Sequence, residues 1–239
     1  MFLKAIPFFS IISISFLLTV SFTTKEEVYV TFEANSKDHT IQLFYKDGAG
    51  ERYGSLGKLQ SSLREDSMEL VFAMNAGMYM EDRQPLGLYI ESGKEIRPLN
   101  QRNSSSGNFY LMPNGVFAID KQGKMSVCQT EDFHLLQDIA FATQSGPMLL
   151  INGEMHPAFN KGSSNLNIRN GVGILPNGNL LCVMSKQPGN FYDFASLFAS
   201  KGCQNALYLD GFVSKVYYPE GEWVQKGGNF GAIIAITAK

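Results

Sequence analysis

The chain has 239 residues, of which 44% are hydrophobic and 18% charged, so it is long and apolar enough to fold around a substantial core. Its formal net charge of -2, without any cluster of Lys and Arg, argues against nucleic acid as a main partner. Aromatic residues make up 12% of the chain, which favours a β-rich protein.

The first 23 residues are predicted to be a signal peptide or an N-terminal anchor. Lys4 precedes an uncharged apolar and Ser/Thr-rich run from residue 5 to residue 24, which is typical of a secretory signal. The run approaches the ~20 residues that span a bilayer, so residues 5–22 as an uncleaved anchor are an alternative. In both cases we expect the remainder to be secreted or periplasmic, with membrane contact only through this segment.

Alternating polarity, short apolar runs and Gly, Asn or Pro turns predict a succession of strands. We place them at residues 27–33, 40–45, 69–73, 87–90, 95–98, 109–112, 115–119, 125–128, 140–146, 147–151, 168–174, 180–184 and 205–209.

Two segments have helical patterns instead. Residues 56–65 carry leucines at helical spacing, and a second helix begins at Asn190, which forms a cap-like pair with Asp193, and ends at Gly202. The chain therefore predicts a mixed α/β (α+β) fold: one β-rich domain over residues 24–239, with mixed sheets and two or three helices.

The cysteines and histidines form no recognisable metal site. The three cysteines lack metal-ligand spacing and are predicted to be buried free thiols, although one disulfide is possible. The three histidines are isolated in sequence, whereas a zinc phosphodiesterase needs several ligands. We therefore expect neither a metal nor another cofactor. These residues are Cys128, Cys182, Cys203, His39, His134 and His156.

Four clusters of a polar residue beside glycine follow apolar strands. They are Asn75-Ala-Gly-Met-Tyr79, Gln144-Ser-Gly-Pro147, Arg169-Asn-Gly-Val-Gly173 and Asp210-Gly-Phe-Val-Ser214. Asp210-Gly211 alone favours an ordinary hairpin turn, and the alternative is a strand that delivers one carboxylate to a cleft. Four such clusters suggest loops that converge on one pocket.

In this order, the four clusters resemble the phosphodiester glycosidase (uncovering-enzyme-like) family, over roughly residues 69–238. Its members show Asn-x-Gly-(Phe/Met)-(Phe/Tyr), Ser-Gly-Pro, Arg-x-x-x-Gly-(Ile/Val) and Leu-Asp-Gly-Gly-x-Ser elements. Phe212 stands where the family has the second glycine of the last element, which points to a reshaped loop. The resemblance implies a secreted hydrolase that cleaves a sugar-1-phosphodiester of an envelope or environmental glycan.

The chemistry of that reaction indicates which side chains are needed. A phosphate monoester, with a second pKa of ~6, is a good leaving group, so the site depends less on a general acid than ordinary glycosidases do. Arg169 suits the phosphate, and Asp210 suits the role of nucleophile, base or electrostatic stabiliser, with Asn75 as a third catalytic residue. The candidate substrate-binding residues are Gly77, Tyr79, Gln144, Ser145, Gly146, Asn170, Gly171, Gly211 and Ser214.

Other interpretations remain open at this stage. Ser145 is not in a Gly-x-Ser-x-Gly nucleophile elbow, which argues against a serine hydrolase. The main rival is a secreted glycan-binding or envelope-structural protein that uses the same pocket without turnover. Phe212 favours that rival, and the presence of Arg169 together with Asp210 favours the enzyme. Arg169 as a surface ion pair and Asn75 as a turn or cap residue are the structural alternatives.

Overall fold

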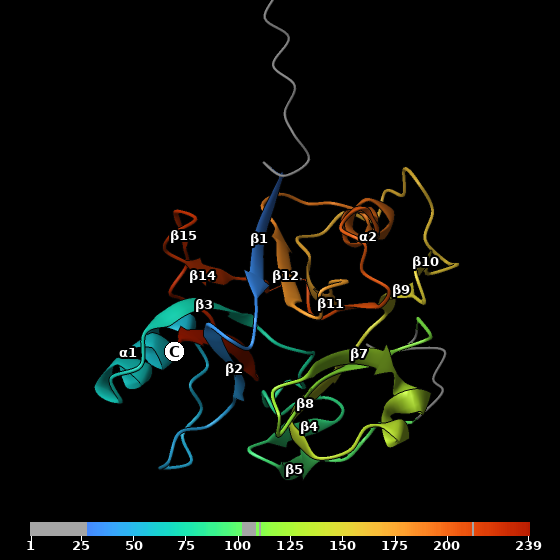
Figure 1. The fold of residues 1–239 in the computed structure, drawn as a ribbon. Helices are drawn as coiled ribbons and strands as arrows, with labels where there is room; N and C mark the ends of the chain where they lie inside the picture. Colours follow the sequence, from blue (N-terminus) through green and yellow to red (C-terminus); the bar gives the residue numbers. More distant parts are fainter. Residues whose placement is uncertain (1–27, 102–108, 110, 212) are drawn as a thin grey trace, which may run out of the picture.

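The structure, a computed structural model, describes residues 28–101, 109, 111–211 and 213–239. Within these residues the chain forms three antiparallel sheets, two α-helices and one 3-10 helix (Figure 1). The prediction of a β-rich mixed α+β fold is therefore confirmed, but the predicted mixed sheets are wrong, because every strand pair among the described residues is antiparallel.

The largest sheet has six strands and contains the stretch that ends near Asp210. Its order is β1 (Tyr29–Ala34), β12 (Leu180–Ser185), β11 (Asn170–Ile174), β13 (Ala206–Tyr208), β9 (Met148–Ile151) and β10 (Glu154–Met155). The antiparallel register places Gly171 of β11 opposite Tyr208 of β13. The start of β11 and the end of β13 therefore lie side by side.

The other two sheets have five strands each. The second sheet is ordered β15 (Trp223–Val224), β14 (Val216–Tyr218), β3 (Leu70–Asn75), β16 (Ile233–Ala238) and β2 (His39–Phe44). The third sheet is ordered β5 (Lys94–Arg97), β4 (Tyr89–Glu91), β8 (Ile139–Ser145), β6 (Gly115–Asp120) and β7 (Met125–Gln129).

Each α-helix covers one sheet and begins at a side-chain cap. Helix α1 (Leu56–Glu65) starts where the Ser55 hydroxyl accepts the Lys58 N–H, and its leucines pack against residues of β3 and β16. Helix α2 (Phe191–Ser200) starts where Asn190 accepts the Asp193 N–H, and its apolar face packs against β9, β12 and β13. Both helices were predicted, α1 from the spacing of its leucines and α2 from its apolar face and the cap residue Asn190.

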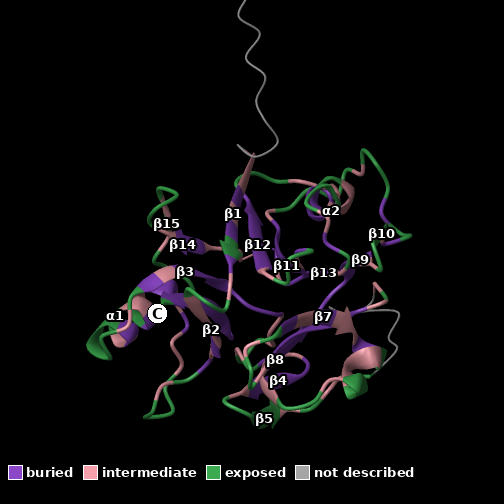
Figure 2. Cartoon of the chain, in the orientation of Figure 1, coloured by how far each residue is buried: buried purple, intermediate pink, exposed green. Residues whose placement is uncertain are grey.

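The main core lies where the three sheets face one another. It joins side chains such as Phe32 and Leu207 of the first sheet, Phe72 and Ile234 of the second, and Phe117 of the third. Figure 2 shows the buried residues concentrated in these strands. Buried polar residues are the exception in such a core, and several of them gather where strands of different sheets end.

Some predicted elements differ from the structure. The predicted strand at 109–112 is wrong for its described residues: Phe109 lies in a turn, and Leu111 and Met112 form a bend before Pro113, which has no N–H for a ladder. The 3-10 helix η2 (Thr130–Leu135) and strand β16 were not predicted. The three cysteines are free thiols, of which Cys182 and Cys203 are buried as predicted, whereas Cys128 is only half-buried. No helix in the described residues is long and apolar enough to cross a membrane.

Candidate functional site

Asp210 lies on a crossover between two sheets. Strand β13, two residues before it, pairs with β11 and β9 in the six-stranded sheet, whereas β14 pairs with β3 and β15 in the second sheet. A hairpin would pair β13 with β14, so the interpretation of Asp210-Gly211 as an ordinary hairpin turn is wrong. The carboxylate instead stands at the point where the chain passes from one sheet to the other.

Asn170 fixes the backbone at Asp210. Its Oδ1 accepts the Asp210 N–H at 2.8 Å, its backbone carbonyl accepts the Leu209 N–H at 3.0 Å, and its Nδ2 donates to the Asn75 carbonyl at 2.8 Å. Asn170 is fully buried. Both ends of its amide are therefore used within the protein, and it acts on the site by positioning its neighbours.

Asn75 is the last residue of β3 and joins the same cluster. Its Oδ1 accepts the Lys215 N–H at 3.0 Å, on the crossover that follows Asp210. Its Nδ2 is buried and has no hydrogen-bond partner among the described residues. Because an unpaired buried donor costs about 1–3 kcal/mol, this amide is suited to a ligand or a bound water.

The Ser145 hydroxyl connects the third sheet to the cluster. It donates to the Leu209 carbonyl, directly before Asp210, and the residue is fully buried. Gly77 lies against the same strand end: a Cβ at this position would stand 2.6 Å from both the Gln144 carbonyl and the Thr143 hydroxyl. Only glycine allows this close approach at position 77. Together with the bonds of Asn170 and Asn75, the Ser145 bond brings strands of all three sheets to Asp210.

Gln144 points away from this cluster. Its Oε1 accepts the N–H groups of Leu88 and Asn100, and its Nε2 donates to the Asn100 carbonyl and the Thr130 hydroxyl. All hydrogen-bonding positions of the amide are thus occupied within the protein. The structure does not bring the Gln144 side chain to Asp210, so its predicted contact with substrate remains a prediction.

Arg169 is buried beside the cluster. Its guanidinium lies 3.6 Å from the Phe191 ring centroid and 5.6 Å from that of Tyr208. Nε donates to the Gly189 carbonyl at 2.7 Å and Nη2 to the Asn165 carbonyl at 2.9 Å. The residue is 1% exposed, so Arg169 does not lie on the surface. Its predicted contact with phosphate stays a prediction.

The charge of the Asp210 carboxylate affects the pKa of two tyrosines, Tyr79 and Tyr208. Burial raises the pKa of Tyr208 to about 12. The charge of Arg169 and its hydrogen bond lower this pKa, and the charge of Asp210 raises it. Burial, followed by the charge of Asp210, also raises the pKa of Tyr79. Both phenols are therefore protonated at neutral pH and can donate hydrogen bonds.

The remaining predicted residues follow from these positions. Gly211 allows close packing: a Cβ there would stand 1.9 Å from the Tyr208 hydroxyl and 2.6 Å from the Ile168 carbonyl. The Ser214 hydroxyl donates to the Asp210 carbonyl. Gly171 lies inside β11 opposite Tyr208. Gly146 follows Ser145 and packs against the Asn114 side chain. Phe212 lies outside the described residues, so the effect of this departure stays untested.

Sequence reasoning missed the aromatic surroundings of Arg169. Phe159 stacks on Phe191 with ring centroids 4.9 Å apart, and Phe191 meets Tyr208 edge-on at the same separation. Phe191 opens helix α2 and was taken only as part of that helix. Its distance of 22 residues from Arg169 leaves no local sequence signal for this contact.

The described residues contain no cluster of side chains with the composition of a metal site. No group of three or more His, Cys, Asp or Glu side chains gathers there. Two of the histidines have local backbone partners: the ring of His39 accepts the Asn35 N–H, and that of His134 pairs with the Glu131 carbonyl. His156 is buried between the Met112 carbonyl and the Ala158 N–H, and burial lowers its pKa.

Comparison with solved structures supports the fold. The catalytic domain of zebrafish N-acetylglucosamine-1-phosphodiester alpha-N-acetylglucosaminidase is similar with a TM-score of 0.50 and 18% identity, over 87% of this chain and 88% of that one. A hypothetical protein from Synechocystis gives 0.54 and 14% identity, over 88% and 59%. A putative exported protein from Burkholderia pseudomallei K96243 gives 0.55 and 9% identity, over 83% and 71%.

Sequence comparison shows the family directly. The chain is 35% identical over 209 residues to the uncharacterized protein YigE of Escherichia coli (strain K12), covering 87% of this chain and 81% of that protein. The family model described as phosphodiester glycosidase matches residues 68–232, which contain all four clusters and the strands that bring them together. The chain therefore belongs to the phosphodiester glycosidase family.

Proposed function

We propose that this protein is a secreted or periplasmic hydrolase that cleaves the bond between an anomeric carbon and a phosphate oxygen in a sugar-1-phosphodiester. The single observation that carries the proposal is the fixation of Asp210, whose N–H and preceding carbonyl are held by Asn170 and Ser145. Such pre-organisation suits a carboxylate that must face one reacting atom. The zebrafish relative described above is named as a glycosidase of N-acetylglucosamine-1-phosphodiesters, which are sugar-1-phosphodiesters.

The carboxylate can supply the main chemical step. In the reaction the C1–O bond to phosphate breaks, water provides a hydroxyl to C1, and the phosphate monoester departs with the bonding electrons. Asp210 acts as nucleophile, as base for the water, or as the anion that stabilises the positive charge developing on the sugar. The phenols of Tyr79 and Tyr208, both protonated at neutral pH, are donors for sugar hydroxyls or phosphate oxygens.

Arg169 supplies positive charge to this region. Its contact with Tyr208 and its stacking on Phe191 hold the guanidinium close to the end of β13. Charges interact more strongly in a medium of low dielectric, so this buried cation offsets the charge of Asp210 and favours the approach of an anionic phosphodiester. Its hydrogen bonds to Asn165 also anchor the loop that precedes β11.

The test is the release of free sugar and phosphate monoester from a panel of sugar-1-phosphodiesters. We expect Asp210→Asn to lower kcat by about 10²–10⁴-fold, as the loss of a positioned acid–base group does. Arg169→Ala should also impair turnover. Asp66→Asn, an exposed carboxylate at the end of α1, is the matched control and should keep full activity.

Two outcomes would contradict the proposal. If the native protein binds sugar phosphodiesters without cleaving any of them, the non-catalytic glycan-binding alternative is favoured. If Asp210→Asn, Arg169→Ala and Asp66→Asn all turn over like the native protein, the reacting groups lie elsewhere.

A further inference from the structure

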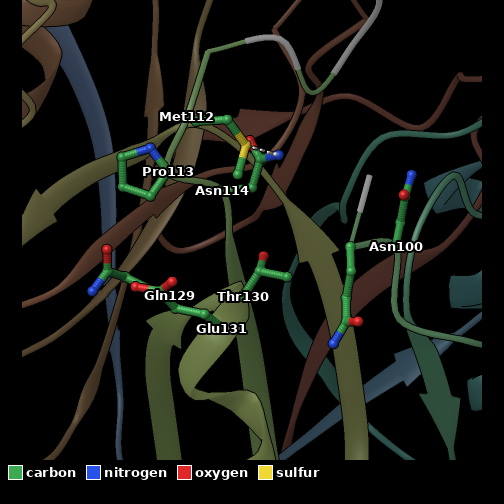
Figure 3. A pocket seen from close by; sticks show the side chains of 8 residues that line it. Asn100, Met112, Pro113, Asn114, Gln129, Thr130 and Glu131 are labelled. Atoms are coloured by element: carbon green, nitrogen blue, oxygen red, sulfur yellow. Dashed lines mark hydrogen bonds between the residues drawn. The ribbon is translucent and has the colours of Figure 1, made fainter. Parts of the chain in front are cut away.

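A separate cavity of about 480 Å³ lies beside the Asp210 cluster. Three segments line it: Asn100 after β5, Met112 to Asn114 before β6, and Gln129 to Glu131 at the start of η2 (Figure 3). Its volume lies within the roughly 300–1,000 Å³ that is typical of small-molecule pockets. None of the residues in the four sequence clusters lines it.

Gln144 holds the walls of this cavity together. Its buried amide donates to the Thr130 hydroxyl at 3.1 Å and exchanges two hydrogen bonds with the backbone of Asn100. The Thr130 N–H in turn donates to the Asn114 carbonyl at 2.9 Å. Because these bonds fix all three segments to one another, the cavity is pre-formed.

The cavity also touches the Asp210 cluster. A Cβ on Gly146 would stand only 2.2 Å from Asn114 Oδ1, so Gly146 and Asn114 are in direct contact. The residue before Gly146 is Ser145, whose hydroxyl bonds the Leu209 carbonyl. Gly146 therefore links the cavity wall at Asn114 to Ser145, whose hydrogen bond to the Leu209 carbonyl positions Asp210.

The lining suits a neutral polyhydroxy ligand. Side chains of Asn100, Gln129 and Thr130 offer both donors and acceptors, and sugar hydroxyls need both. Met112 and Pro113 add apolar surface for the C–H groups of a sugar ring. No described residue that lines the cavity is Lys or Arg, and Glu131 adds a carboxylate, so an anionic ligand would be repelled.

Asn114 is a buried part of the cavity wall. The residue is 2% exposed, and its Nδ2 donates to the Phe109 carbonyl. Its Oδ1 accepts no hydrogen bond from any described residue. Buried polar atoms are satisfied in most folded proteins, by protein, water or ligand. This oxygen is buried against Gly146, so the hydrogen bonds to a ligand in the cavity come from the other lining side chains.

We propose that this cavity is a subsite for a neutral sugar residue, which it holds beside the Asp210 cluster. As a subsite of a glycan substrate it rests on the proposed hydrolase function, but binding of the sugar requires no turnover. The probes are therefore free methyl glycosides: methyl glucoside and methyl N-acetylglucosaminide as neutral ligands, and methyl glucuronide as the anionic counterpart.

The experiment is a titration of the ¹⁵N-labelled chain followed by amide chemical shifts. A neutral glycoside should shift the amides of Asn114 and of residues 129–131. Gln129→Ala removes one hydrogen-bonding side chain and should raise Kd about three- to tenfold. Gln122→Ala, an exposed glutamine in the turn at the other end of the β6–β7 hairpin, is the control and should leave Kd unchanged. Methyl glucuronide should have a higher Kd than the neutral glycosides, because its charge is repelled by Glu131. Glu131→Gln removes this repulsion and should bring the Kd of methyl glucuronide closer to that of the neutral glycosides.

The inference is overturned if no neutral glycoside shifts these amides, if Gln129→Ala binds as well as the native chain, or if methyl glucuronide binds more tightly than the neutral probes. Asp210→Asn should bind the neutral probes like the native chain. Sugar binding without hydrolysis would thus count against the proposed function alone, and hydrolysis without sugar binding here would count against the subsite alone.

Discussion

Replacing Asn170 by alanine tests the arrangement that fixes Asp210. The change removes the acceptor for the Asp210 N–H and the donor to the Asn75 carbonyl, both at 2.8 Å. Each abandoned buried group costs about 1–3 kcal/mol, so we expect the free energy of unfolding to fall by roughly 2–6 kcal/mol. That is a large part of the roughly 5–15 kcal/mol by which domains are stable.

Urea denaturation measures this loss, and amide hydrogen exchange at Asp210 locates it. In the native chain the Asp210 amide should be protected, and in Asn170→Ala it should exchange much faster. Asn160→Ala is the control. This exposed side-chain amide makes one long hydrogen bond of 3.4 Å within the part of the chain that the structure describes, so its loss should change stability by less than about 0.5 kcal/mol. A loss below 1 kcal/mol in Asn170→Ala, with the Asp210 amide still protected, would refute the positioning role.

Three further predictions concern the surroundings of the site. Gly211→Ala places a methyl group against the Tyr208 hydroxyl and the Ile168 carbonyl, so it should cost about 1–3 kcal/mol and lower Tm by about 2–12 °C; an unchanged Tm in calorimetry would mean that the neighbours move freely. Burial raises the pKa of Tyr208 to about 12 in the folded chain, against 10.0 ordinarily. The protonated phenol therefore makes its full contribution to the free energy of unfolding below pH 10, and this contribution is lost as the pH rises to about 12. Over that window the native chain should lose roughly 2–3 kcal/mol more than Tyr208→Phe in urea titrations, and parallel curves would contradict the shift. Asn190→Ala removes the cap of α2, including its bond from the Asp193 N–H, and should cost about 1 kcal/mol in urea titration; no change would mean that packing alone fixes the start of the helix.

Much of the fold is visible in the sequence because its signals are local. The leucines at 56, 59 and 63 with Ser55 before them specify α1, and Ser92-Gly93 specifies the β4–β5 hairpin. A polar residue close to glycine at the end of an apolar strand is also a local signal. It identifies Asn75, Ser145 and Asp210, which the structure brings together.

The other features of the site depend on which strands, distant in sequence, pair with one another. Asp210-Gly211 has the local signature of a hairpin, and only the assignment of β13 and β14 to different sheets excludes it. Likewise, nothing local in the sequence indicates that Asn170 is hydrogen-bonded to Asn75 and Asp210, and its predicted contact with substrate remains a prediction. Contacts over 40 to 95 residues, such as these two, leave no periodic pattern in the sequence.

The central claim is that Asp210 directs cleavage of the bond from sugar to phosphate oxygen. Hydrolysis of a sugar-1-phosphodiester in H₂¹⁸O, followed by ³¹P NMR and mass spectrometry, tests it most directly. We predict that the native chain places ¹⁸O in the released sugar, that the phosphate monoester is unlabelled, and that Asp210→Asn slows the reaction by at least about 100-fold. Label in the phosphate, or equal rates for the two proteins, would contradict the claim.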